Sequence, residues 1–242
     1  MHIQPIQSSE YSAIVFFTGA GMSAESGIPT YRGKGGIWVK YRWEEVACEA
    51  AFGDDPQKVL DFHRERRRGV AQCQPNTGHQ VIAGLEQRHP QVTVVTQNID
   101  GLHQRAGSVN VIELHGSLWC FRCPTDGRRL EIEPESDYPD HCECGAWLRP
   151  DIVWFGDNLD QAGINHAAKL LEECDLFISV GTSGTVWPAA GFPQVARQNG
   201  ARCLEINPEP NEMSHLYDQT YRAPAAEVLP LLFPTTGAAA KS

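Results

Sequence analysis

The cysteines of this chain are unevenly spaced, and four of the eight lie between residues 120 and 144. These four are Cys120, Cys123, Cys142 and Cys144. Thiolates this close together are typical zinc ligands, and in a chain without an export signal a metal site is expected before disulfides. The spacing C-x2-C-x18-C-x-C resembles the usual C-x2-C…C-x2-C zinc pattern but differs from it in the second half.

A glycine-rich turn, Gly19-Ala20-Gly21, directly follows the apolar run AIVFFT. It begins a G-x-G-x-x-A pattern, in which glycines let the backbone approach a pyrophosphate and the next helix offers free N–H groups. The alternative is a tight turn that binds nothing. An ordinary dehydrogenase also carries an acidic residue about 20 residues further on, at the end of a second strand. Residues 25–33 instead form a loop rich in Gly and Pro, which disfavours hydride transfer and leaves open a dinucleotide bound in an unusual orientation.

Polar residues follow four further apolar runs of the chain, at the point where each run ends. They are Gln97, Asn98 and Asp100, then His115, then Gly181, Thr182 and Ser183, and then Asn207. In open α/β sheets, ligands bind at the carboxyl ends of the strands. Any one of these residues could be a satisfied core or capping residue, but their convergence on one edge predicts a ligand site there.

The apolar runs predict a parallel sheet. Short β-branched segments at 13–17, 92–96, 109–114, 176–180 and 203–206 alternate with helical patterns such as 75–88, 161–173 and 188–199. Strands that are apolar throughout are typical of a sheet covered on both faces. We therefore expect an α/β fold with a doubly wound, Rossmann-like parallel sheet.

Two segments interrupt this alternation. Residues 33–69 are polar and rich in Trp and Arg, with candidate helices at 43–52 and 56–68, and residues 117–150 contain the cysteine cluster. We expect the helical module 33–69 and the cysteine module 117–150 to pack together as a smaller, zinc-binding domain. Residues 1–32, 70–116 and 151–242 would then form the larger, Rossmann-like domain that carries the glycine turn, with a cleft between the two.

Composition limits the classes of partner. The chain has 242 residues, 41% of them hydrophobic, and a formal net charge of -10. The acidic balance argues against a surface for nucleic acid, and we expect no sequence-specific nucleic-acid partner. No apolar run is long enough to span a bilayer, and the first residues lack an apolar stretch after a basic start, so we expect a cytoplasmic protein with no membrane partner.

Six motifs, in order and spacing, resemble the sirtuins, a family of NAD-dependent protein-lysine deacylases, and in particular their bacterial desuccinylase and deacetylase branch. The motifs are TGAGMSAESGIPTYRG, TQNIDGLH, ELHGSL, LRPDIVWFG, VGTSGTVWPAA and EIN, and the resemblance runs from about residue 13 to residue 230. It implies that NAD is consumed as an acyl group leaves lysine, giving nicotinamide and O-acyl-ADP-ribose.

The resemblance also implies roles for individual residues. His115 would be the general base, with Asn98 and Asp100 holding the ribose and nicotinamide end of NAD. The wider set implied to contact or position NAD is Gly19, Ala20, Gly21, Glu25, Tyr31, Arg32, Trp38, Gln97, Asn98, Ile99, Asp100, Gly181, Thr182, Ser183, Asn207, Pro208, Glu209 and Ala225.

Substrate residues follow from the same resemblance. The acylated peptide would lie between the domains, added as a strand beside residues 153–156 and 184–187, with contacts from Val153, Phe155, Gly156 and Val186. In the branch that accepts succinyl, malonyl or glutaryl groups, a Tyr and an Arg three residues later bind the distal carboxylate.

Here Arg66 matches that Arg, but His63 stands in place of the Tyr, and Lys34 in the glycine loop replaces a small residue. His63 could donate a hydrogen bond or, if protonated, supply a second positive charge; the alternative is an exposed helix residue.

The cysteine cluster departs from the family pattern. Aligned on the flanking motifs, only Cys123 and Cys144 fall on the usual zinc positions, and Asp126 and His141 occupy the other two. We expect one structural zinc, bound by Cys120, Cys123, Cys142 and Cys144, with Asp126 and His141 as alternative ligands. A metal-free hairpin held by packing remains the alternative.

Two other functions use a similar nucleotide site. One is ADP-ribosyl transfer to protein, which differs from deacylation in its product. The other is a non-catalytic module that senses NAD or ADP-ribose, against which the presence of Asn98, Asp100 and His115 counts.

Overall fold

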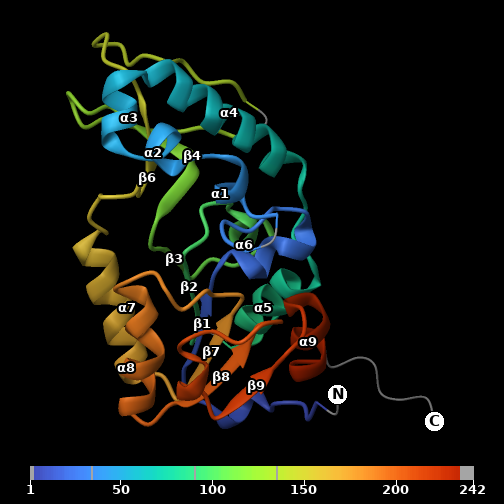
Figure 1. Cartoon of the computed structure of the whole chain (residues 1–242). Coiled ribbons are helices and arrows are strands. Elements are labelled where there is room, and N and C mark those ends of the chain that lie inside the picture. Colours follow the sequence, from blue (N-terminus) through green and yellow to red (C-terminus); the bar gives the residue numbers. More distant parts are fainter. Residues whose placement is uncertain (1–2, 34, 90, 135, 235–242) are drawn as a thin grey trace.

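A six-stranded parallel sheet forms the centre of the larger domain (Figure 1). The computed structural model of the chain describes residues 3–33, 35–89, 91–134 and 136–234. The strand order is β3-β2-β1-β7-β8-β9, so the chain runs outward from β1 to one edge and then from β7 to the other. The strands are β1 (Ile14–Thr18), β2 (Val92–Thr96), β3 (Val111–Glu113), β7 (Leu176–Val180), β8 (Arg202–Ile206) and β9 (Gln219–Tyr221).

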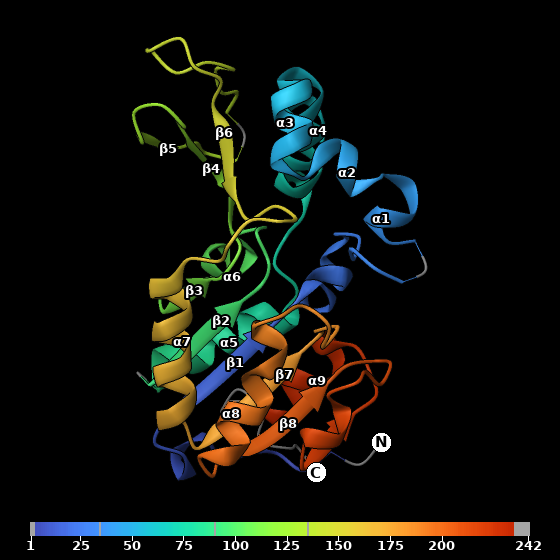
Figure 2. The ribbon, with the colours of Figure 1, turned by 60° about the vertical axis from the view of Figure 1, so that its left-hand side comes forward.

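Helices cover both faces of this sheet, as Figure 2 shows. One face packs on α5 (Thr77–Arg88) and α9 (Ala225–Leu232), and the other packs on α7 (Gln161–Glu173) and α8 (Phe192–Gln198). All five residues of β1 and all five of β7 are buried, because each strand has a hydrophobic layer on both sides. The predicted doubly wound α/β fold is confirmed.

The predicted elements agree closely with the structure where the apolar pattern is strong. The ranges expected for β2, β7 and α7 match to the residue. Strand β9 was not predicted, because it has only three residues and two of them are exposed. The helix expected at 188–199 begins later, since a 3-10 turn, Ala189–Gly191, precedes α8. The helix expected after the glycine turn is likewise a 3-10 helix, η2 (Ala20–Ser26), which ends at Gly27 with φ 90°.

The smaller domain joins four helices to a second sheet. The helices are α1 (Ile37–Lys40), α2 (Trp43–Val46), α3 (Glu49–Asp54) and α4 (Pro56–Gln72). The antiparallel sheet has the order β5-β4-β6 and consists of β4 (Gly116–Arg122), β5 (Arg129–Glu131) and β6 (Arg149–Ile152). One hydrophobic cluster unites helices and sheet, with Leu60 and Phe62 against Leu118, Phe121 and Leu148.

Two caps shape the helical part of this domain. The helix expected over 43–52 is divided into α2 and α3, because Cys48 adopts an extended conformation and caps Ala51 N with its sulfur. Helix α4 begins at Pro56. The preceding residue, Asp55, caps this helix by accepting a hydrogen bond from Lys58 N at 3.0 Å. Proline at the first helical position and Asp at the cap are favoured there, so the start of α4 is locally encoded.

The carboxyl ends of β1 and β7 meet at the point where the strand order reverses, and their backbones are in contact. A Cβ on Gly21 would lie 2.6 Å from Gly181 Cα, and one on Gly181, whose φ is +63°, would lie 2.4 Å from the Gly21 carbonyl carbon. Gly21 N donates a hydrogen bond to Gly181 O at 2.9 Å. No residue other than glycine fits at either position without displacing backbone.

Replacement of Gly181 by Ala should therefore be strongly destabilising. The left-handed φ alone costs an alanine about 1–2 kcal/mol, and the contact with Gly21 adds to it. Chemical denaturation should show a fall of more than about 2 kcal/mol in the free energy of unfolding. Gly69→Ala is the matched control, because Gly69 lies within α4 with no atom near its would-be Cβ, and it should be neutral or stabilising by up to about 1 kcal/mol. Equal stability of the two variants would contradict the role given to this contact.

Candidate active site

A cavity of about 640 Å³ opens at the carboxyl edge of the parallel sheet, and both domains contribute to its wall. Such crevices at the reversal of strand order are the usual ligand sites of open α/β sheets. Most of the predicted nucleotide residues line it: Gly19, Ala20, Gly21, Tyr31, Arg32, Trp38, Gln97, Asn98, Ile99, His115, Gly181, Thr182, Ser183, Asn207 and Glu209. All six predicted substrate residues line it as well: His63, Arg66, Val153, Phe155, Gly156 and Val186.

Four predicted residues do not line this cavity. Asp100 borders a small adjoining cavity that shares Asn98, Tyr31 and Arg66 with the large one. Glu25 instead accepts a hydrogen bond from Ala226 N at 2.8 Å, which ties the end of η2 to the first turn of α9, where Ala225 is buried. Pro208 lies exposed in the loop after β8.

The structure also adds lining residues that were not predicted, among them Thr30, Ala47, Asp157 and Asn211, whereas Trp154, Thr185 and Trp187 belong to the segments 153–156 and 184–187 expected beside the peptide. Asn211 lies in the same loop after β8 as Asn207, so the rule that selected Asn207 could have been extended to it.

Asn98 and Asp100 are joined through Ser23. Asn98 Nδ2 donates to Gly19 O at 3.0 Å and to Ser23 Oγ at 3.3 Å, and Ser23 Oγ donates to Asp100 Oδ2 at 2.7 Å. All three of these side chains are buried, and burial raises the pKa of the Asp100 carboxyl. With both Nδ2 hydrogens used, the Oδ1 atom of Asn98 is left as an acceptor beside the glycine turn.

His115 follows β3 at the cavity wall. Its Nδ1 lies 2.9 Å from Gln97 O, which can only accept, so Nδ1 carries the proton and Nε2 is an unprotonated base. Within the part of the chain described, Nε2 has no hydrogen-bond partner. Burial lowers the pKa of His115 below its ordinary value of 6.5, outweighing the hydrogen bond to Gln97. The imidazole is therefore neutral, oriented and able to accept a proton at neutral pH.

Arg66 projects from α4 into an aromatic part of the same cavity. Its Nη2 donates to Tyr31 Oη at 2.8 Å, and its guanidinium lies 5.0 Å from the Tyr31 ring centre and 5.8 Å from that of Phe62. Residues 3–33, 35–89, 91–134 and 136–234 contain no carboxylate in an ion pair with it. A half-buried cation without an acidic partner suits an anionic ligand.

His63 is buried on the same helix rather than exposed, with 1% of its surface accessible. Trp154 Nε1 donates to its Nε2 at 3.3 Å, and the two rings stack with centres 6.0 Å apart. Burial and the charge of Arg66 lower the pKa of His63 to about 3. Of the two forms that the sequence left open, the neutral ring is therefore favoured, because a desolvated imidazole resists protonation. Lys34 lies outside the described residues.

The segment after β6 is largely bonded within the chain. Val153 N donates to His115 O at 2.9 Å, Trp154 N to Asp157 Oδ2 at 3.0 Å, and Phe155 N to Ala47 O at 3.0 Å. A peptide strand beside this segment would therefore pair mainly with its carbonyl groups and with Gly156.

Three of the four predicted zinc ligands come together with Asp126. Cys123 Sγ lies 3.5 Å from Cys144 Sγ, and Cys142 Sγ lies 3.5 Å from Asp126 Oδ2, with all four donor atoms within 4.8 Å of one another. A tetrahedral zinc with bonds of about 2.0–2.3 Å places its donors about 3.3–3.8 Å apart, so the cluster fits zinc.

The fourth expected ligand, Cys120, is outside this cluster, and Asp126 takes its place. Side chains alternate along a strand, so Cys120 in β4 faces away from the side on which Phe121 and Cys123 are buried. His141, the other alternative, is also outside the cluster and packs its ring on Trp147 at 4.0 Å between centres.

Comparison with known proteins identifies the family. Residues 19–188 match the model of the Sir2 family. The chain is 46% identical to an NAD-dependent protein deacylase of Aquifex aeolicus, over 88% of this chain and 90% of that protein. It is 44% identical to NAD-dependent protein deacylase 2 of Pyrobaculum aerophilum, over 96% of this chain and 94% of that protein. The chain belongs to the Sir2 family.

Solved Sir2 structures share its fold. A Sir2 homolog in complex with NAD superposes with a TM-score of 0.85 at 40% identity, covering 95% of this chain and 93% of that one. A mutant of another Sir2 homologue, in complex with 2'-O-acetyl ADP ribose, gives a TM-score of 0.85 at 43% identity, covering 91% of this chain and 90% of that one. The resemblance found in the six sequence motifs is confirmed.

The metal cluster of this Sir2 protein can be tested by its metal content. We expect one zinc per chain, which Cys120→Ser should retain and which Cys144→Ser and Asp126→Ala should bind more weakly. Elemental analysis after dialysis against a graded series of chelator concentrations measures this directly. Zinc loss in Cys120→Ser at the same chelator concentration as in Cys144→Ser would show that the ligand set differs from Cys123, Asp126, Cys142 and Cys144.

Proposed function

We propose that this Sir2 protein is a protein-lysine deacylase that uses NAD as co-substrate. The observation that carries the proposal is the placement of an oriented, neutral His115 in the same cavity as the Asn98–Ser23–Asp100 group and the glycine turn. NAD, when bound, supplies the ADP-ribosyl group that takes the acyl chain, and the products are nicotinamide, free lysine and O-acyl-ADP-ribose. The names of the Sir2 relatives support this reaction.

The glycine turn suits the pyrophosphate of a dinucleotide. Gly19 and Gly21 bring the backbone to the cavity wall without a side chain in the way, where backbone N–H groups can meet phosphate oxygens. Asn98 and Asp100 hold the ribose next to the reacting bond. Their burial excludes water, which would otherwise compete as the acceptor of the ADP-ribosyl group.

His115 acts as a general base through its Nε2 atom. The hydrogen bond from Nδ1 to Gln97 O keeps the other nitrogen free to take a proton from a ribose hydroxyl. Proton removal by a positioned base typically contributes about 10²–10⁴-fold to a rate.

Replacement of His115 by Ala should lower kcat by at least about 10²-fold, since only the base is removed. Binding of ADP-ribose should change little, because the imidazole acts on the reaction rather than anchoring the nucleotide. Turnover of an acetyl-lysine peptide and calorimetric titration with ADP-ribose measure the two effects. Full turnover in His115→Ala would refute the assigned role, and protein-bound ADP-ribose in place of O-acyl-ADP-ribose would indicate transfer to protein instead.

The pH dependence of turnover should report the same imidazole. Burial lowers the pKa of His115, so the neutral, base-competent form persists below the ordinary value of 6.5. We expect kcat to be constant from pH 8 down to about 6.5 and to fall only below that value. A profile measured at saturating NAD and peptide checks this, and an acidic limb centred above 6.5 would contradict it.

The acyl group is the finer part of the proposal. Arg66 lies in an aromatic pocket and forms no ion pair with a carboxylate among the residues that the structure describes, which supports a dicarboxylic acyl chain, such as succinyl or malonyl, in addition to acetyl. A carboxylate entering this pocket loses water, and a fixed guanidinium compensates for that loss. Neutral His63, held by Trp154, shapes the wall beside it without adding charge.

Arg66→Met should reduce succinyl-lysine turnover far more than acetyl-lysine turnover. A charge-assisted hydrogen bond worth about 1.5–3 kcal/mol predicts a loss of at least about tenfold in kcat/KM for the succinyl peptide. The control is Arg68→Met, because Arg68 is exposed on the same helix and lies 3.8 Å from Asp137 outside this cavity. Both peptides share one backbone sequence. An equal loss for the two acyl groups in Arg66→Met would make Arg66 a structural residue.

A further inference from the structure

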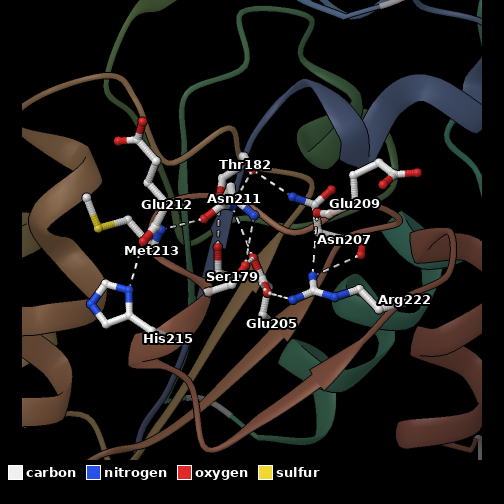
Figure 3. Close-up of polar contacts among 11 residues, drawn as sticks. Ser179, Thr182, Glu205, Asn207, Glu209, Asn211, Glu212, Met213, His215 and Arg222 are labelled. Carbon is white, nitrogen blue, oxygen red and sulfur yellow. Dashed lines mark hydrogen bonds and ion pairs between the residues drawn. The ribbon is translucent and has the colours of Figure 1, made fainter.

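Glu205 is a buried carboxylate beneath the nucleotide side of the cavity (Figure 3). It precedes the last residue of β8, and 1% of its surface is accessible. Its Oε1 accepts from Asn211 Nδ2 at 3.0 Å and from Ser214 Oγ at 2.9 Å, and its Oε2 lies 2.7 Å from Arg222 Nη2. A carboxylate removed from water in this way is stable only because it is fully hydrogen-bonded.

The network continues from Glu205 to the loop after β7. Asn211 Nδ2, which contacts Glu205, also donates to Thr182 O at 3.0 Å, and Asn207 Nδ2 donates to the same oxygen at 2.8 Å. Gly184 packs so closely on Asn211 that a Cβ there would lie 2.8 Å from Asn211 Oδ1. Thr182, Asn207 and Asn211 all line the cavity. The position of the Thr182 backbone thus depends on two amides, of which Glu205 orients one.

Arg222 connects the same carboxylate to the loop after β8. While Nη2 contacts Glu205, its Nη1 donates to Asn207 O at 3.2 Å, so one guanidinium holds both the buried acid and the loop backbone. Figure 3 shows Asn211 above Glu205 and Arg222 to the right of it. The pair therefore connects the loop after β7 with the loop after β8. Asn98 and His115 follow β2 and β3, on the other side of the strand reversal.

We infer that Glu205 and Arg222 are a positioning pair that sets the affinity for the nucleotide without acting in the chemical step. The inference rests on the proposed use of NAD. Loops held in the binding conformation before the ligand arrives need less ordering on binding, so loss of the pair weakens binding. Asn98 and His115, which are proposed to act at the reacting bond, follow β2 and β3 and so lie on the other side of β1 from this pair. The kcat at saturating NAD should therefore be preserved.

The test compares Glu205→Gln with wild type. The Gln keeps the size of the side chain but places an NH2 group against donors, so at least one bond to Asn211, Ser214 or Arg222 is lost. We expect the Kd of ADP-ribose and the KM of NAD each to rise by about tenfold, as loss of one hydrogen bond to a charged group implies. The kcat at saturating NAD and peptide should change by less than about twofold. Arg222→Met should behave alike, and Arg222→Lys should recover part of the affinity.

The matched control is Asp218→Asn. Asp218 also braces β8, accepting from Cys203 N at 2.8 Å and pairing with Arg197 at 2.9 Å, but it does not contact the cavity loops. Its nucleotide affinity should equal that of wild type. An unchanged Kd in folded Glu205→Gln and Arg222→Met, or the same loss in Asp218→Asn, would overturn the inference.

Melting temperatures identify variants that fail to fold. Titration with ADP-ribose measures binding and does not depend on turnover. A wild-type protein that binds ADP-ribose but does not deacylate the acetyl-lysine peptide would refute the deacylase proposal. The binding test of Glu205 and Arg222 would still apply.

Discussion

The contact between the backbones of Gly21 and Gly181 is the constraint on which the site depends. β1 and β7 are neighbours in the sheet although Thr18 and Val180 are 162 positions apart in the chain, and their ends can approach only because no side chain intervenes. This approach places the turn after β1 and the loop after β7 on one wall of the cavity.

Buried polar groups around this contact are stabilised by their neighbours rather than by water. Asn98 and Asp100 share Ser23, and Glu205 shares Arg222 with the loop after β8. Each group would destabilise the fold if left unpaired in the interior, so each also determines how its loop is placed. The loops on both sides of the strand reversal are therefore held rigidly. Such rigidity suits a reaction that requires the ribose to be held in one orientation.

The smaller domain connects to the same cavity through stacked and charged contacts. The Arg149 guanidinium lies 3.9 Å from the Trp154 ring centre and pairs with Glu49 and Asp157. Trp154 in turn donates to His63 on α4. The segment after β6, helix α3 and the cavity wall around His63 are thus one connected unit, while the cysteine cluster follows the other end of β4 in the same small sheet.

The sequence alone determined the sheet, most of the cavity lining and the family. Uninterrupted apolar strands predicted the doubly wound fold, and residues directly after strand ends predicted Gly19, Asn98, His115, Gly181 and Asn207 at one cavity, because parallel strands end at the same edge. Only the tertiary structure decided contacts between residues far apart in the chain. The turn after Cys123 brings Asp126 into the cysteine cluster, and the pleat of β4 turns Cys120 away from it. Burial against Trp154 makes His63 neutral, although a helix position by itself allowed a charged ring. Spacing along the chain specifies which side chains are available, but desolvation and partner choice arise only when the chain is folded.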